Sequence, residues 1–456
     1  MRTPGSGTEQ ATGRLLRLAG PTPLVRRLSV QSVLSAFGDG VFLTGSAVFF
    51  TQVVGLSAAQ VGLGLSVAGA VTFLLAVPLG KASDRFGARR VWALTSLLEA
   101  LLYLAWLAVG GFAGFLAVLV VLQVVTSSSK SARNAYRFDV FPREERVSSN
   151  AYFRAARNVG YTLGAGLAGM ALATNSDDVV RAVPAVTAAL LLLNAWWVTR
   201  LPARIDTAAG AEAAAVGTAH ESPLEDVLHD PGDRRSALRN RGYVAMSVLG
   251  GILGTHQVLL NVVIPLWLVE ETDAPRVLLA WLFGTNTVMA VALQVAAARG
   301  ITTVAQSLRA QRRGAYFFVA SCGIVLVTHD TVGWVTIALV WIGHVTVTGA
   351  ELFQSAGEWG LQAELSDPER RGEYQGVAQL GYTLGTVWAP AAYTFLAMEW
   401  GAQGWLVIGA IVVVAAVGIH PAAQAAQRHL DRLDHLDRID GRGSTTPAPG
   451  DPAGPA

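Results

Sequence analysis

The chain has 456 residues, of which 52% are hydrophobic and only 14% are charged, and its net charge is +2. A soluble domain carries roughly 25% charged residues, so the composition excludes a set of ordinary soluble domains. The small net charge gives no reason to expect nucleic acid as a partner. Cys322 is the only cysteine, which excludes an intrachain disulfide and a cysteine-based zinc site.

Residues 1–28 contain arginines but no apolar core, so they do not form a cleaved signal peptide, and we interpret them as a cytoplasmic tail. Twelve mostly apolar stretches follow, each near the length of about 20 residues that a spanning helix needs. They are about 30–54, 59–80, 91–111, 113–136, 149–173, 179–199, 242–267, 277–298, 314–328, 332–355, 373–397 and 402–420. The ninth is short and is expected to extend back towards Arg313. Because lipid cannot satisfy backbone polar groups, we predict an all-α membrane protein with twelve transmembrane helices.

Arginine-rich loops alternate along the chain with loops that are nearly free of arginine, and this alternation indicates the orientation of the helices. The loop after span 2 carries three arginines, and those after spans 4, 8 and 10 carry two or three each, whereas loops 55–58 and 110–114 carry no charge. By the positive-inside rule both termini are cytoplasmic, and we expect a multi-pass protein of the cell membrane.

The longest break between spans covers residues 201–240 and is rich in alanine, glycine and charged residues. We interpret it as a cytoplasmic linker between a six-helix bundle over 29–200 and a second over 241–420. A cytoplasmic tail, 421–456, would follow. Leucines at helical spacing up to Ile439 predict a short surface helix after Pro421, and the residues from Gly441 onward are typical of disorder.

The word "GYTLG" occurs twice, 221 residues apart, near the middle of spans 5 and 11. Because the copies fall in the fifth helix of each half, they favour a duplicated six-helix unit, although glycine-rich helices can also repeat short words by chance. We expect the glycines to serve close helix packing at a moving interface, and Tyr161 and Tyr382 to reach a cavity. The packing glycines would be Gly160, Gly164, Gly169, Gly381 and Gly385.

The loop after span 2, "GKASDRFGARR", resembles the signature that the major facilitator superfamily carries between spans 2 and 3. The matching positions are Gly80, Asp84, Arg85, Gly87, Arg89 and Arg90. The resemblance implies that family's fold, two pseudo-symmetric six-helix bundles. It also implies that Asp84 lies near the start of span 11, about Gly372–Glu373, and that the arginines join a network that closes the inner side. The alternative is that the arginines only orient the helix.

A comparison of the two halves of the chain, and one of span 5 with a second family signature, both bear on the expected transport mechanism. In the second half Ser307 and Ala310 stand where Asp84 and Gly87 stand in the first, so a gate would be asymmetric. Span 5 is similar to the signature of the family's drug:proton antiporters, but Ala165 replaces its proline. The departure weakens the inference of antiport.

Ionisable residues within spans are costly and therefore functional candidates. The resemblance implies that spans 1, 4, 7 and 10 line a central cavity. The candidates for proton coupling or substrate contact in this cavity are Asp39, Lys130, Arg133, His256, His344 and Glu351. Structural pairing, snorkelling of Arg133 to the interface and packing of the histidines are the alternatives. Arg154 and Arg157 share a face with Tyr161 and could join the gate or bind an anionic group.

The favoured function is proton-coupled efflux of a small amphipathic or drug-like molecule by alternating access, by a chain that works as a monomer. The alternatives are an uptake symporter, a facilitator or a non-transporting receptor with the same fold. Neither lysine stands in a phosphate-binding loop, and no nucleophile elbow or metal-ligand cluster occurs, so we expect neither ATP-driven transport nor an enzyme. No cofactor and no metal are expected; the partners would be a small-molecule substrate, protons and lipid.

Overall fold

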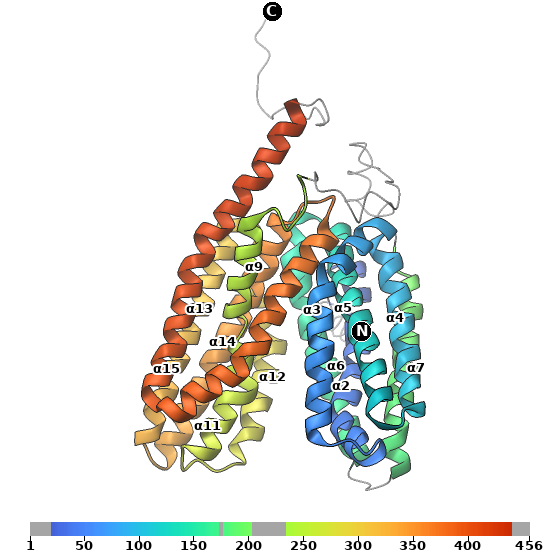
Figure 1. The fold of residues 1–456 in the computed structure, drawn as a ribbon. Coiled ribbons are helices and arrows are strands. Elements are labelled where there is room, and N and C mark those ends of the chain that lie inside the picture. Colours follow the sequence, from blue (N-terminus) through green and yellow to red (C-terminus); the bar gives the residue numbers. More distant parts are fainter. Residues whose placement is uncertain (1–19, 173–176, 203–233, 440–456) are drawn as a thin grey trace, which may run out of the picture.

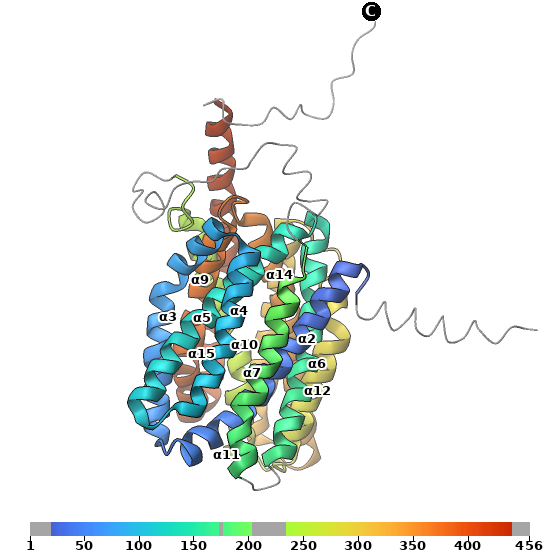
Figure 2. The ribbon, with the colours of Figure 1, turned by 90° about the vertical axis from the view of Figure 1, so that its right-hand side faces the viewer.

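The computed structural model describes residues 20–172, 177–202 and 234–439, and these ranges contain helices, turns and loops. Two helical bundles lie side by side (Figure 1; Figure 2 shows the first bundle in front). The first consists of α2 (Pro23–Val48), α3 (Ala58–Phe86), α4 (Ala88–Ala105), α5 (Gly111–Val140), α6 (Arg146–Leu172) and α7 (Asp177–Thr199). The second consists of α9 (Arg241–Leu253), α10 (His256–Val258), α11 (Ile264–Glu270), α12 (Leu278–Ala297), α13 (Val304–Leu326), α14 (Trp334–Leu365) and α15 (Arg371–Ile439).

The expected fold class is confirmed, with six spans in each bundle. Helices α9, α10 and α11 form one interrupted span, and α15 contains two spans separated by a kink at Gly401, whose φ of 50° favours glycine. Judged by length and composition alone, seven of the described helices are long and apolar enough to cross a membrane. Others, such as α2 and α6, are less apolar because they carry charged side chains inside the bundles.

Helix ends coincide with residues suited to them. Ser57 caps α3 by accepting a hydrogen bond from the Gln60 N–H at 3.2 Å, and the Gln60 side chain accepts from the Ser57 N–H at 2.9 Å. Gly87, with a φ of 86°, separates α3 from α4. Asn240 caps α9 by accepting from the Tyr243 N–H at 3.0 Å. These caps fix where neighbouring spans begin and end.

Two predicted boundaries are wrong. Helix α13 begins at Val304, because Thr303 caps it, so the arginines Arg309, Arg312 and Arg313 lie on the helix rather than in a loop. After span 12 no separate short helix forms: α15 continues through Pro421 to Ile439 and projects beyond the other helices (Figure 1). A proline removes one backbone donor, and the alanine-rich residues that follow it favour continuation of the helix.

Most of the two predicted tails and of the linker is not tested by this structure. The expected N-terminal tail up to residue 19, the linker segment 203–233 and the segment from residue 440 onward lie outside the described residues.

The two "GYTLG" copies occupy equivalent places. A Cβ atom on Gly160 would overlap the Val33 carbonyl oxygen of α2, and one on Gly381 would overlap the Ser247 carbonyl oxygen of α9. Gly164 and Gly385 repeat these contacts one turn later. Span 5 therefore packs on span 1 as span 11 packs on span 7. These interfaces lie within each bundle, so the expectation of packing at a moving interface between the halves is wrong.

Gly169 does not pack as predicted. It is exposed, and no atom lies within 4 Å of the position that its Cβ would occupy. It lies nine residues after Gly160, and at about 100° per residue this places it on the opposite face of α6.

Spans 1 and 7 share a second feature. Each contains a π-helical segment, Phe49–Val53 and Leu259–Val263. Span 7 is also interrupted at Gly254 and Thr255, between α9 and α10. Single π-helical turns are frequent at functional sites.

Candidate functional site

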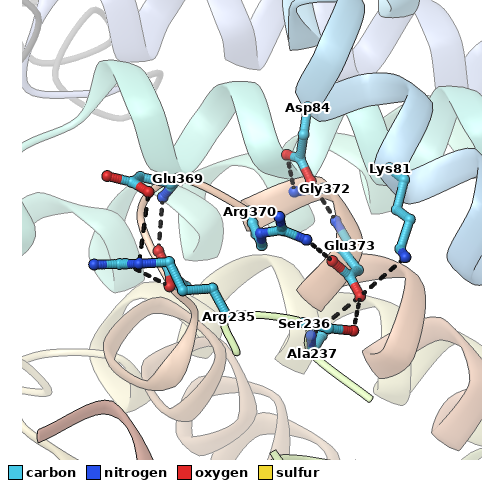
Figure 3. A network of polar contacts seen from close by, with 10 residues as sticks. Lys81, Asp84, Arg235, Ser236, Ala237, Glu369, Arg370, Gly372 and Glu373 are labelled. Carbon is cyan, nitrogen blue, oxygen red and sulfur yellow. Dashed lines mark hydrogen bonds and ion pairs between the residues drawn. The ribbon is translucent and has the colours of Figure 1, made fainter. Parts of the chain in front are cut away.

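A carboxylate of the first bundle caps a helix of the second. The Asp84 Oδ1 and Oδ2 atoms accept hydrogen bonds from the Gly372 and Glu373 N–H groups at 2.5 and 2.7 Å (Figure 3). These donors belong to the first turn of α15, where the helix dipole also favours a negative charge. Gly80 makes the contact possible, because a Cβ there would overlap the Gly372 carbonyl oxygen. We call the end of the bundles that contains Asp84 the motif end.

Glu373 extends this contact to the segment before α9. Its side chain is fully buried and accepts hydrogen bonds from the Ser236 hydroxyl at 2.7 Å, the Ala237 N–H at 3.1 Å and Arg370 at 3.1 Å. The Lys81 ammonium of the first bundle lies 3.8 Å from the same carboxylate (Figure 3). Glu373 thus connects the signature loop to the end of the inter-bundle segment.

Further pairs join the bundles at the motif end. Arg371 binds Asp139 at 2.6 Å, and Arg143 binds Glu364. The side of the motif end where α6 meets α12 and α14 is instead apolar. Its buried residues are Val147, Ala151, Ala298, Ile301, Ala310 and Ala356. The closure is therefore polar beside α3 and α15 and apolar beside α6 and α12.

Among the described residues, the arginines of the signature make no cross-bundle contact of the kind expected for a closing network. Arg89 donates to the Leu201 carbonyl oxygen at 2.5 Å, Arg85 lies over the Phe86 ring at 5.4 Å, and Arg90 is exposed. These contacts stay within the first bundle. Lys81 and Arg371 form the cross-bundle ion pairs instead, because their side chains face the opposite bundle.

An ion-pair cluster also holds the C-terminal extension of α15. Arg235 contacts Asp367 at 2.8 Å, Glu369 at 3.7 Å and Asp437 (Figure 3 shows the pair with Glu369). Partial burial disfavours the charged guanidinium, but Asp367 and Asp437 outweigh it and hold the pKa of Arg235 above its ordinary value. No sequence pattern indicates this cluster, because its members lie in three separate segments.

The centre of the first bundle brings together three of the predicted candidates. Asp39 of α2 accepts a hydrogen bond from the Tyr161 hydroxyl at 3.4 Å, and Arg157 donates to the same hydroxyl at 2.9 Å. Lys130 and Arg133 of α5 interact electrostatically with Asp39 and with Arg157. Glu99 of α4, which is not among the six predicted candidates, interacts with Asp39, Lys130 and Arg133. Four helices therefore contribute to one charged cluster.

The second bundle contains the other candidates. Glu351 of α14 is 7% exposed; it binds Arg154 of the first bundle and accepts from the Asn286 amide at 2.9 Å. His256 and His344 are both buried and interact electrostatically with Glu351. Arg154 thus belongs to a cross-bundle pair, one of the two roles that its position on span 5 suggested.

Two exposed side chains, Lys130 and Tyr382, interact with charged residues of the first bundle. Lys130 is exposed although it lies within a span and among the other charges of the cluster. Tyr382, which is 40% exposed, donates to the Gln257 side chain at 3.0 Å and interacts electrostatically with Arg157 and Tyr161. The tyrosines of the two "GYTLG" copies therefore approach each other from the two bundles, and we call their surroundings, with Lys130, the accessible region between the bundles.

The comparisons with known proteins agree with this architecture. The family model described as "Major Facilitator Superfamily" matches residues 28–356. The chain belongs to the major facilitator superfamily. Superfamily members are multi-pass secondary transporters of small molecules and are typically not enzymes, which agrees with the function class predicted from the sequence.

Solved structures of superfamily members share the fold at low sequence identity. The human organic anion transporter MFSD10 has a TM-score of 0.62 at 16% identity, covering 88% of this chain and 100% of its own. A bacterial homologue of the iron transporter ferroportin, in an outward-facing state, has 0.63 at 15%, covering 88% and 100%. The proton:xylose symporter XylE has 0.66 at 14%, covering 86% and 94%. No curated protein matches this chain.

Proposed function

We propose that this superfamily member works by alternating access and that the structure represents the state closed at the motif end. The observation that carries the proposal is the capping of α15 by Asp84 from the other bundle, at 2.5 and 2.7 Å. Such a contact can form in one arrangement of the bundles and break in another without unfolding either. The moving units would be the bundles at 29–200 and 241–420, joined by the linker at 201–240.

We propose that the motif end is cytoplasmic, so that the described state is outward-facing. The arginine-rich loops support this orientation. The fold likeness to the ferroportin homologue, whose structure is outward-facing, is consistent with it. The cell membrane would be the location, with both termini on the cytoplasmic side.

We propose proton coupling through Asp39. Its carboxylate lies in the centre of the first bundle, is partly accessible, and has a tyrosine hydroxyl as its hydrogen-bond donor. Efflux is the proposed direction, supported by two glycines of the antiporter-like pattern, Gly160 and Gly164, which pack on α2. Ala165 in place of proline argues for the alternative of uptake, and the likeness to the symporter XylE is compatible with either direction.

Proton flux in proteoliposomes tests the coupling. A growth-resistance screen on expression supplies a transported compound, and an internal pH dye reports the flux that this compound drives. We expect Asp39→Asn to abolish the substrate-driven flux while the compound still binds. The matched control is Asp330→Asn, which changes an exposed carboxylate away from the cluster and should leave the flux unchanged. Native flux in Asp39→Asn would remove this residue from the coupling role.

A further inference from the structure

The charged cluster of the first bundle contains more cations than anions. Lys130, Arg133 and Arg157 interact electrostatically with one another. Among the described residues, Asp39 and Glu99 are the carboxylates that interact most strongly with these cations. Arg137 adds a fourth cation nearby; it lies over the Phe153 ring at 4.3 Å and donates to the Ser32 hydroxyl at 2.9 Å. With all these groups ionised, positive charge is in excess by two.

The three central cations are also unpaired in the geometric sense. Among the residues that the structure describes, no carboxylate oxygen lies within 4.0 Å of the side-chain nitrogens of Lys130, Arg133 or Arg157. The Nε atom of Arg133 is buried and has no hydrogen-bond partner in that part of the chain. At the motif end, by contrast, the cross-bundle cations Lys81, Arg143 and Arg371 each have a carboxylate partner.

An excess of cations in a low-dielectric span is unfavourable unless another group compensates it. Burial of an uncompensated charge costs several kcal/mol, and like charges raise that cost. Lys130 is exposed, so water solvates part of the cluster and a soluble molecule can reach it. The cluster therefore offers exposed and unsatisfied positive charge at the centre of a transporter, where substrates bind in this type of fold.

The surroundings of the cluster suit an organic molecule rather than a bare ion. Arg157 interacts with both Tyr161 and Tyr382, one from each bundle. Aromatic rings provide apolar contact area, and their hydroxyls donate hydrogen bonds. The C-terminal bundle adds the amides of Gln257 and Asn261, the second of which is exposed. A ligand that contacts both tyrosines would touch both bundles.

We propose that the accessible region between the bundles binds a small organic oxyanion, a carboxylate or a phosphate, with Lys130, Arg133 and Arg157 as its counter-charges. Guanidinium groups pair with such oxyanions through two parallel hydrogen bonds. This inference rests on the proposed transport function and names its substrate class. It argues against a cationic substrate.

The first test needs no ligand. Because Lys130 adds to an uncompensated positive charge, we expect Lys130→Gln to raise the unfolding temperature of the purified, ligand-free protein. A rise of about 2 °C is the expected scale. Arg371→Gln, which breaks a formed ion pair, should lower it. A lower unfolding temperature in Lys130→Gln would show that the cluster has a counter-charge and would overturn the premise.

The second test measures ligand class on the full chain in detergent. Benzoate and phenyl phosphate are the oxyanion probes, benzylammonium the cation and benzyl alcohol the neutral control. We expect the oxyanions alone to raise the unfolding temperature. Their dissociation constants should be at least about tenfold larger in Lys130→Gln and in Arg133→Gln, since a hydrogen bond to a charged group contributes about 1.5–3 kcal/mol. Lys130→Arg should retain binding, and so should Arg181→Gln, which changes an exposed arginine on α7.

Equal or stronger protection by benzylammonium, no protection by either oxyanion, or unchanged affinity in both glutamine variants would each overturn the proposal. These outcomes are separable from failure of the proposed function. Oxyanion binding without any proton flux would contradict the coupling alone. Flux that depends on Asp39 without oxyanion binding would contradict only the substrate class.

Discussion

Neutralising Asp84 should open the motif end. Burial outweighs the backbone hydrogen bonds and raises the pKa of Asp84 to about 8, so the charged form dominates above this pH. In Asp84→Asn, compared at a pH above about 8, one carbonyl oxygen can still accept from Gly372 or Glu373, but the charge is lost and the amide group faces a backbone donor. The native carboxylate accepts both N–H groups, at 2.5 and 2.7 Å, from the first turn of α15. The substitution therefore removes an interaction that exists only while the two bundles are closed on this side.

The expected magnitude follows from these two contacts. A hydrogen bond to a charged group contributes about 1.5–3 kcal/mol, and a charge at a helix N-terminus about 0.3–1 kcal/mol. Since one acceptor remains, we expect a net loss of about 2–3 kcal/mol. At 1.4 kcal/mol per tenfold, the equilibrium between open and closed states should shift by about 30- to 100-fold.

Cysteine labelling can measure this shift. Val77 of α3 is 7% exposed and packs in the apolar core of the second bundle, so it becomes accessible only when the bundles separate. A Val77→Cys variant in a Cys322→Ala background should react with a maleimide at a rate proportional to the open population. Asp84→Asn should raise that rate about 30- to 100-fold, and the control Asp330→Asn should not. A labelling rate within about twofold of that of the Val77→Cys, Cys322→Ala protein would refute the proposal that Asp84 holds the motif end closed.

Three further variants test other parts of the structure. Gly381→Ala places a Cβ against a backbone carbonyl and should cost about 1–3 kcal/mol in thermal unfolding, whereas Gly169→Ala, with open space around it, should cost nothing. Glu351→Arg should disrupt the cross-bundle pair, and adding Arg154→Glu should restore part of the unfolding temperature; no restoration would contradict the pairing. Arg235→Gln should accelerate hydrogen exchange in the last turns of α15, and unchanged exchange would show that the ion pairs do not hold that segment.

The sequence predicted most of what depends on local composition. Twelve apolar stretches and the arginine-rich loops suffice for the number of spans and the helical membrane fold. The contact of Asp84 with the start of α15 was implied by the resemblance of its loop to the superfamily signature. Close-packing glycines were also recognisable in part, because Gly160 and Gly381 lie in matched helices. The error at Gly169 arose because small-residue spacing does not show which face of a helix meets a neighbour.

Pairing between the bundles could not be predicted in the same way. Arg371 and Asp139 lie 232 residues apart, and Arg154 and Glu351 lie 197 apart. Which of many arginines meets a given carboxylate depends on the rotation of each helix and on the distance between the bundles. Composition constrains neither. The resemblance therefore implied a network of Arg85, Arg89 and Arg90, whereas Lys81 and Arg371 form cross-bundle ion pairs in the described structure.

The polar side of the closed motif end, beside α3 and α15, and the apolar side, beside α6 and α12, contribute differently to closure. When the motif end opens, the cross-bundle ion pairs exchange protein partners for water, so the net free-energy change of each is small. The apolar contact of α6 with α12 and α14 has no such compensation, since its buried residues would be exposed to water. The apolar side therefore adds to the free energy that the capping by Asp84 contributes to closure. The polar side fixes the register in which the bundles meet, because Asp84 fits only the first turn of α15. Substitutions at Ala151 or Ala356 should accordingly alter the closed population while leaving the closed geometry intact, whereas substitutions at Asp84 should alter both.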